Sequence, residues 1–295
     1  MTFHRFIAWF SLGLALATAV AIWFVPPVED FQPDNPFWNG SRQLKEVARI
    51  TPISSLAELP PSPKGVTLIV IPYREFDGGE LELVSHFVDG GGTLVLADDF
   101  GWGNQLLEYL GLAARFSGKV LLDPLFNYKS RWLPRVGVAI GDPLTAGLEH
   151  LTLNYATVLE GVTPERVLAT SSSFSFLDGN GNGLADPGEP LGRQAVMSRE
   201  AFGEGQVVLL GDPSVFISGM LTGENLKLAE NIARTSEAGL YFDQSHLTIS
   251  NLRHAQDGLR ALRGFVFKPP VSVAMVAVVL ALVLLPVWRQ GSRQE

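Results

Sequence analysis

The chain has 295 residues, of which 46% are hydrophobic and 18% charged, and this length is sufficient for one large domain or two small ones. Its formal net charge is −8 and no lysine and arginine cluster stands between residues 50 and 250, so it lacks the basic surface that a nucleic-acid partner requires. The chain has no cysteine, which excludes disulfides, thiolate nucleophiles and cysteine-ligated zinc.

The first predicted element is a transmembrane anchor at residues 1–26. Residues 6–25 contain no charged side chain and are long enough to cross the hydrocarbon core of a bilayer. A cleaved signal peptide is the alternative, but the run is longer than a usual signal-peptide core and no small-x-small cleavage site follows it. Trp9 and Trp23 are placed for the two membrane interfaces. We therefore expect an uncleaved helix in contact with the lipid bilayer.

A linker at residues 27–64, rich in proline and polar residues, follows the anchor and contains one expected helix near 41–49. Short apolar runs then alternate with helical stretches, predicted as strand, helix, strand and helix at 65–72, 77–89, 93–98 and 104–110. This order predicts an α/β domain with parallel strands.

The second part of the domain, which is expected to span 65–235, is richer in strands. These are predicted at 119–122, 136–140, 166–176, 194–200 and 206–211. Glu204-Gly205 indicates a hairpin turn between the last two strands, and 225–234 is predicted to be a closing helix. The expected fold is a mostly parallel sheet with helices on both faces and a β-rich insertion.

A juxtamembrane segment at 236–268 and a second transmembrane helix at 269–289 are predicted to complete the chain. Residues 271–288 are uncharged and rich in valine and leucine. The run is too long for an ordinary strand and too uniformly apolar for a surface helix. We therefore expect the folded domain to lie between two membrane spans.

The positive charges next to the two spans predict the topology. Arg5 precedes the first span, and Arg289 and Arg293 follow the second, the latter in the short tail at 290–295. Because positive charges near a span favour the cytoplasmic side, both ends are expected in the cytoplasm and the main domain outside it. The basic residues at 260, 263 and 268 act against this orientation.

Three runs carry a family resemblance: FVDGGGTLVLADDFGWGNQLLEYLGL (87–112), GQVVLLGDPSVF (205–216) and ENLKLAENI (224–232). They resemble a family of membrane proteins known as domain of unknown function 4350, over about residues 40–235. The resemblance implies the flavodoxin-like fold of class I glutamine amidotransferases, flanked by two transmembrane helices. Relatives are often found beside MoxR-type ATPases and other membrane components, so the resemblance also implies a partner in a membrane complex.

Family members often carry an Asp-Glu-x-His-His-like segment before the last helix. The corresponding run here, 242–246, retains only Asp243 and His246. His246 is therefore a candidate site residue on the strength of the resemblance alone.

The loop DGNGNGLADPGE at 178–189 has the spacing of a calcium-binding loop, with oxygen-bearing side chains at positions 1, 3, 5, 9 and 12 and glycine at position 6. The predicted ligands are the side chains of Asp178, Asn180, Asn182, Asp186 and Glu189 and the backbone carbonyl of Leu184. A glycine- and asparagine-rich turn is the alternative, but a turn does not require the two late acids. Strand-like flanks and only three carboxylates indicate a weak, structural Ca²⁺ site.

Asp98 and Asp99 follow a predicted strand, where ligands and catalytic groups gather in α/β folds. The resemblance implies a nucleophile at this turn, but without cysteine thiolate-dependent glutaminase chemistry is excluded. Asp212 follows another strand and is expected to cap a turn or to face the same crevice. The two acids at 98 and 99 are otherwise expected to cap the next segment or to line a vestigial site.

The function expected from the sequence is a membrane-tethered, extracytoplasmic, non-catalytic binding or assembly domain in a membrane complex. One alternative is a divergent hydrolase or transferase that uses Asp98, Asp99 and Asp212. Another is an accessory subunit of an ABC-type transporter, because some of these systems contain similar amidotransferase-like domains.

Overall fold

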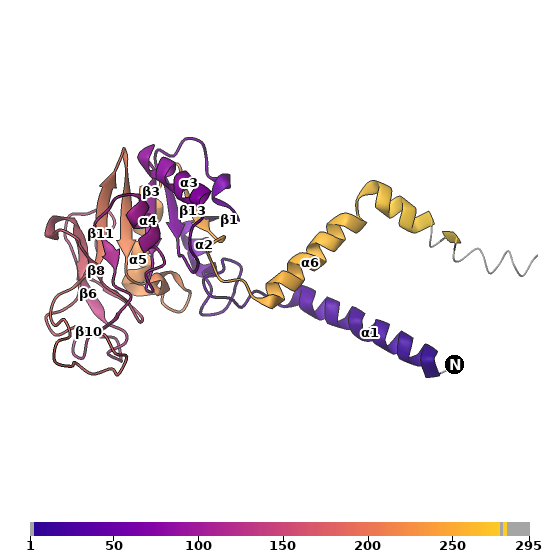
Figure 1. The fold of residues 1–295 in the computed structure, drawn as a ribbon, viewed down its shortest axis with the longest axis horizontal. Coiled ribbons are helices and arrows are strands. Elements are labelled where there is room, and N and C mark those ends of the chain that lie inside the picture. Colours follow the sequence, from indigo (N-terminus) through magenta and orange to yellow (C-terminus); the bar gives the residue numbers. More distant parts are fainter. Residues whose placement is uncertain (1–2, 278–279, 282–295) are drawn as a thin grey trace, which may run out of the picture. The chain divides into compact units, whose positions relative to one another are not determined.

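A computed structural model of the chain describes residues 3–277 and 280–281. It divides the chain into two units, of which one is Pro26–Thr248 and the other holds the N-terminal segment to Val25 and the segment from Ile249 onward. The first of these units contains every strand of the described chain (Figure 1).

The unit outside the folded domain contains the helices α1 (Phe3–Phe24) and α6 (Asn251–Val266). Within the described residues, α1 alone is long and apolar enough to cross a membrane, as a membrane anchor or a signal sequence does. The predicted second span at 269–289 falls largely outside the described residues, and its described part, 269–277 and 280–281, is helical.

Five parallel strands form one half of the sheet in the folded unit. Their order across the sheet is β1 (Thr51–Ile53), β13 (Gly239–Asp243), β2 (Val66–Val70), β3 (Thr93–Ala97) and β12 (Gly205–Leu210). The last strand of the chain thus pairs between β1 and β2. The sheet therefore includes strands from both sides of the range predicted for the domain, 65–235.

The other half of the sheet is antiparallel and continues from β12. It consists of β11 (Ala195–Phe202), β9 (Val167–Thr170), β6 (Arg135–Val138) and β7 (His150–Thr152), with β8 (Leu159–Glu160) on β11 and β4 (Arg115–Phe116) on β8. β5 (Val120–Leu122) and β10 (Phe176–Asp178) form a separate pair. The predicted hairpin is confirmed, because β11 and β12 pair directly across Gly203 and Glu204.

Helices lie on both faces of the parallel half. On one face, Leu68, Leu94 and Leu96 pack with the helices α3 (Gly78–Asp89) and α4 (Asn104–Tyr109). On the other face, the alternate residues Ile69 and Val95 pack with α2 (Arg42–Ala48) and α5 (Gly223–Thr235). Short 3₁₀ turns occur at η1 (Leu56–Glu58), η2 (Pro164–Arg166) and η3 (Pro213–Phe216). Because strand side chains alternate between faces, the two core clusters lie on opposite sides of a mixed α/β sheet, which confirms the predicted class.

Candidate functional site

The loops that follow the parallel strands gather at one edge of the sheet. β3 is followed by Asp98 and Asp99, β12 by Asp212, β2 by the loop of Tyr73, and β13 by the loop of His246. Because the carboxyl ends of parallel strands share one edge, this is where ligand sites form in open α/β sheets. The structure therefore brings all four candidate catalytic residues to the same edge.

Asp98 holds a turn. One of its oxygens accepts the backbone N–H of Phe100 and Gly101, both at 2.9 Å, and the other accepts the N–H of Gly103 at 2.6 Å. The carboxylate is 1% exposed. Burial raises the pKa of Asp98, and the three N–H donors act against that rise. Its oxygens are thus already occupied by the backbone that starts α4.

Asp212 is fully buried and occupied in the same way. Its Oδ2 accepts the N–H of Asn154 at 2.6 Å, and its Oδ1 accepts the N–H of Ser214 at 2.7 Å. Burial raises the pKa of Asp212 to about 7, the two N–H donors oppose the rise, and the charge of Asp99 adds to it. The residue therefore joins η3 to the loop after β7.

Asp99 has a different environment, because it is partly exposed and has no neighbouring cation that lowers its pKa. Burial raises the pKa of Asp99 to about 7, with a further contribution from the charge of Asp98. Tyr73 lies among these acids: burial raises the pKa of its hydroxyl, and the charges of Asp99 and Asp30 raise it further. No sequence motif marks Tyr73, so its place among these acids could not be predicted from its segment.

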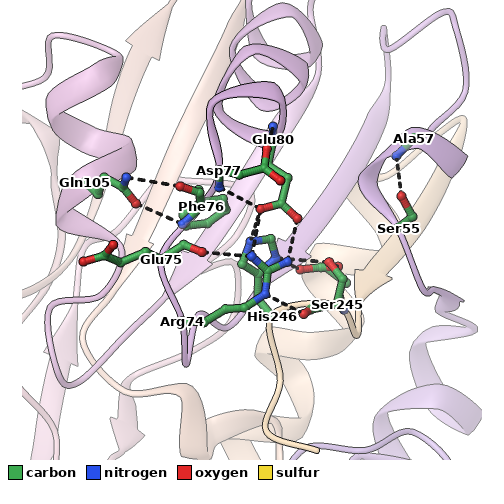
Figure 2. A network of polar contacts seen from close by, with 11 residues as sticks. Ser55, Ala57, Arg74, Glu75, Phe76, Asp77, Glu80, Gln105, Ser245 and His246 are labelled. Carbon is green, nitrogen blue, oxygen red and sulfur yellow. Dashed lines mark hydrogen bonds and ion pairs between the residues drawn. The ribbon is translucent and has the colours of Figure 1, made fainter.

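His246 is completely buried in a separate network at the same edge (Figure 2). Its Nδ1 lies 2.5 Å from Asp243 Oδ2, and its Nε2 lies 3.4 Å from Glu80 Oε2. The second contact has an ion-pair distance but not the geometry of a hydrogen bond. The ring of Phe76 packs on the imidazole with centroids 4.1 Å apart. The two residues retained from the family segment are thus direct partners.

Arg74 and Glu80 complete this network. The guanidinium donates to both oxygens of Glu80, at 2.8 and 2.5 Å, and its Nε donates to the backbone carbonyl of Ser245 at 3.0 Å. Glu80 also accepts the N–H of Asp77, which makes a capping box at the start of α3. The hydrogen bonds from Arg74 lower the pKa of Glu80 to about 2. The D-x-x-E spacing at 77–80 is the sequence signal for this contact.

The predicted calcium loop is closed by its own first residue. Asp178 accepts the N–H of Gly181, Asn182 and Gly183 at 2.7, 3.2 and 2.8 Å. Gly183 has φ +73°, a conformation that favours glycine. Glu189 reaches back to the N–H of Gly179 at 2.7 Å. Residues from both ends of the loop therefore fold over its centre.

Asp186 lies between the two asparagines. Its Oδ2 accepts the side-chain N–H of Asn180 and Asn182 at 2.7 and 2.6 Å, while the amide oxygens of both accept backbone N–H groups. Rotating the two amides would turn their oxygens toward Asp186 and present the hard oxygen ligands that calcium prefers. The three carboxylates of the loop are not among the described acidic groups that converge within 4.8 Å, so a bound cation would have to contract the loop.

In the described part of the chain, a different group of two acids and a histidine has ligand atoms close enough for a metal ion. Glu149, His150 and Glu224 have ligand atoms within 4.8 Å of one another. Glu224 Oε2 accepts the N–H of Glu149 and of His150, and its Oε1 lies 3.2 Å from His150 Nδ1. These contacts fasten the start of α5 to β7, which accounts for the arrangement without a metal.

Comparison with known proteins gives a family and a fold. The family described as "Domain of unknown function (DUF4350)" matches residues 33–233. Among solved structures, one described as "mmIFT52 N-terminal domain" is 19% identical, and the match covers 72% of this chain and 95% of that one with a TM-score of 0.52. At this identity the likeness shows the fold alone. No curated protein matches the chain.

Two further solved structures are similar over smaller parts of the fold. A β-galactosidase from Bacillus circulans sp. alkalophilus is 16% identical over 57% of this chain and 22% of that one, with a TM-score of 0.35. A thua-like protein from Bacteroides uniformis is 14% identical over 58% of this chain and 71% of that one, with a TM-score of 0.32.

Glu80→Gln is expected to destabilise the folded unit at neutral pH and to have little effect in strong acid. Because the pKa of Glu80 falls from 4.5 to about 2 on folding, its contribution is fully present above pH 4.5 and is lost as the pH falls toward 2. The loss at neutral pH is roughly 3 kcal/mol. Urea unfolding of both proteins across this range measures it, with the exposed Glu82→Gln as control. Equal differences at every pH would contradict the assignment.

Asp99→Asn is expected to stabilise the protein above pH 7. The pKa of Asp99 rises from 3.8 to about 7 on folding, so the wild type loses stability as the pH rises through this interval, whereas asparagine carries no charge. Partial exposure screens the effect to on the order of 2 kcal/mol. Thermal unfolding at several pH values measures the difference, which should vanish below pH 3.8. A variant that is less stable at high pH would contradict the prediction.

Proposed function

The chain belongs to the DUF4350 family, and on that premise we propose that its folded unit is a membrane-tethered, extracytoplasmic binding or assembly domain without catalytic activity. The proposal rests on the observation that the candidate catalytic groups are already engaged in hydrogen bonds or buried. Asp98 and Asp212 have backbone N–H donors on both oxygens. His246 is buried between Asp243 and Glu80.

Acid–base catalysis needs a group that reaches the substrate and exchanges protons with it. Two of the three aspartates are held by the backbone of their own turns, and the imidazole has 0% exposure. Cysteine is absent from the chain, so an amidotransferase-like fold here would lack the thiolate of a glutaminase. An edge where two of the three aspartates and the histidine are held by their own structural contacts is suited to recognition or to structural support.

The membrane tether rests on α1 and on the charges of the sequence. We propose an uncleaved N-terminal span and a second span at 269–289, with both ends in the cytoplasm and 27–268 outside. The implied partners are the bilayer and other subunits of a membrane complex, of the kind that stands with MoxR-type ATPases.

The alternative is a divergent hydrolase or transferase, and one observation favours it. Asp99 and Asp212 have pKa values raised to about 7, and the charge of Asp99 contributes to the rise at Asp212 and at Tyr73. Carboxyl groups that titrate near neutral pH are a frequent property of catalytic acids. In the described chain, both carboxylate oxygens of Asp98 and of Asp212 accept hydrogen bonds, whereas those of Asp99 do not. Asp99 therefore decides between the two functions.

Complementation of a deletion strain with Asp99→Asn tests the proposal. A binding or assembly domain is expected to retain full complementation and the native mass of its membrane complex, because this carboxylate makes no hydrogen bond or ion pair with another described residue. The measurements are growth or phenotype rescue and native electrophoresis of solubilised membranes. Rescue lost at unchanged protein level and unchanged complex mass would overturn the proposal in favour of catalysis.

We further propose that the loop at 178–189 holds a structural calcium ion through Asp178, Asn180, Asn182, Asp186 and Glu189 and the carbonyl of Leu184. The support is the ligand spacing together with the closed loop that Asp178 organises. Its position directly after β10, which pairs with β5, would let the ion fasten the long excursion to the rest of the fold.

Calcium at a hundredfold excess over its dissociation constant is expected to raise the melting temperature by roughly 5 °C. Asp186→Asn combined with Glu189→Gln should abolish this rise. The Asp186 substitution leaves the backbone contacts of Asp178 in place. Calorimetry of the full chain with calcium and with chelator measures the shift, and Glu204→Gln is the charge control. No calcium-dependent shift in the wild type would remove the site.

A further inference from the structure

A recess lies away from the carboxyl edge, on the antiparallel half of the sheet. It is a groove of about 430 Å³ over β6 and β9, and Phe126, Pro164 and Arg193 lie along its walls. None of the acidic residues at the carboxyl edge lines it.

The floor of the groove includes the small residues Gly137, Ala139, Ala169 and Thr170. Gly137 of β6 pairs with Thr170 of β9, which in turn pairs with Ala195 of β11. A Cβ atom added at Gly137 would meet no other atom within 4 Å. This part of the sheet face is therefore open, unlike the parallel half, where helices cover both faces.

Two arginines stand at one end of the groove. Arg135 precedes Gly137 by two residues, and Arg193 precedes Ala195, the β11 partner of Thr170, by two residues. β6 begins at Arg135, and β11 begins two residues after Arg193. Both strands run antiparallel to β9, so they begin at the same end of the sheet, and both arginines line the groove. Strands two apart in a sheet are about 10 Å from each other, a spacing that suits two separate anions of one ligand.

Neither guanidinium has a carboxylate within ion-pair distance among the described residues, although Arg135 stacks over the ring of Tyr128 at 5.5 Å. The nearby Asp123 is fully buried and already occupied. It accepts the N–H of Leu125 and Phe126 and the hydroxyl of Ser172. The positive charge of the groove is thus unbalanced in a protein of net charge −8.

Elsewhere the lining of the groove is both polar and apolar, and Thr170, Ser171 and Ser172 supply the polar part. Ala139 and Val167 line its length, and Phe126 at the rim is 53% exposed and stacks on the equally exposed Phe174 with centroids 6.0 Å apart. Exposed aromatic rings beside arginine are the side chains that most often anchor protein partners. A suitable ligand therefore combines carboxylates with apolar side chains along an extended chain.

We propose that this groove binds an extended acidic peptide segment of a partner protein, with its carboxylates on Arg135 and Arg193 and its apolar side chains on Phe126 and the small-residue floor. The inference rests on the proposed binding role and names the surface and the chemistry of the partner. An arginine fork binds carboxylate through paired hydrogen bonds. Because the protein has a net charge of −8, long-range electrostatics would repel an acidic segment. Only a local positive site would hold it.

The test uses the full chain in detergent micelles and fluorescein-labelled poly-L-glutamate as the probe, followed by fluorescence anisotropy. The wild type is expected to bind saturably. Arg135→Gln with Arg193→Gln should weaken binding roughly tenfold or more, the loss expected from two charge-assisted contacts. Lys64→Gln with Lys119→Gln changes the net charge equally at remote exposed positions and should leave the affinity unchanged.

The Gly137→Leu variant tests whether binding depends on the shape of the groove as well as on its charge. It fills the open space above the floor without altering any charge and should also weaken binding, while thermal unfolding confirms that the variant folds. No binding by the wild type, equal binding by the arginine and lysine double variants, or undiminished binding by the leucine variant would each overturn the proposal. Binding of phosphatidylglycerol vesicles in place of poly-L-glutamate would also overturn it, by identifying a membrane surface as the occupant.

Native electrophoresis of membranes from cells that express the arginine double variant separates this inference from the proposed function. A smaller complex is expected if the groove recruits the partner. An intact complex together with lost poly-L-glutamate binding would overturn the partner assignment and leave the assembly role in place. Lost rescue by Asp99→Asn with an intact complex would instead overturn the assembly role.

Discussion

The buried contact of His246 with Asp243 and Glu80 fastens the end of the folded unit to its beginning. β13 pairs between β1 and β2, so the sheet is complete only when the last strand has joined it. Arg74 from the loop after β2 and Glu80 from α3 meet the residues that follow β13. Removing one partner of a buried hydrogen bond leaves the other unsatisfied and costs about 1–3 kcal/mol. The loops after β2 and β13 at the carboxyl edge therefore depend on this network for their relative position.

The same edge explains why candidate catalytic residues coincide with structural ones. Each loop that leaves a parallel strand must turn sharply, and its N–H groups need acceptors. Asp98 and Asp212 supply those acceptors and are consequently occupied, whereas Asp99 keeps a carboxylate free beside Tyr73. Recognition moves to other surfaces in this interpretation. The uncovered face of the antiparallel half has the open floor and unbalanced positive charge that the carboxyl edge lacks.

Much of the fold could be predicted from local patterns. The strands at 66–70 and 93–97, the helix α3 with its acidic cap, and the hairpin of β11 and β12 follow from hydrophobic periodicity and turn residues. The pairing of β13 between β1 and β2 could not be predicted, because strand order depends on contacts between segments nearly two hundred residues apart. The groove could not be predicted for the same reason, since its lining joins Gly137 and Thr170 from two strands and Arg193 from the segment before a third.

The sequence by itself determined the class of the fold, the apolar N-terminal helix, the absence of thiol chemistry and the spacing of oxygen ligands at 178–189, because these depend on composition and on short-range periodicity. Only the tertiary structure decided which polar groups are free. The roles of Asp98, Asp212 and His246 follow from hydrogen-bond partners that the fold brings to them. A carboxylate or imidazole has the same letter in a sequence whether it faces solvent or a backbone amide, and burial and partners set its chemistry.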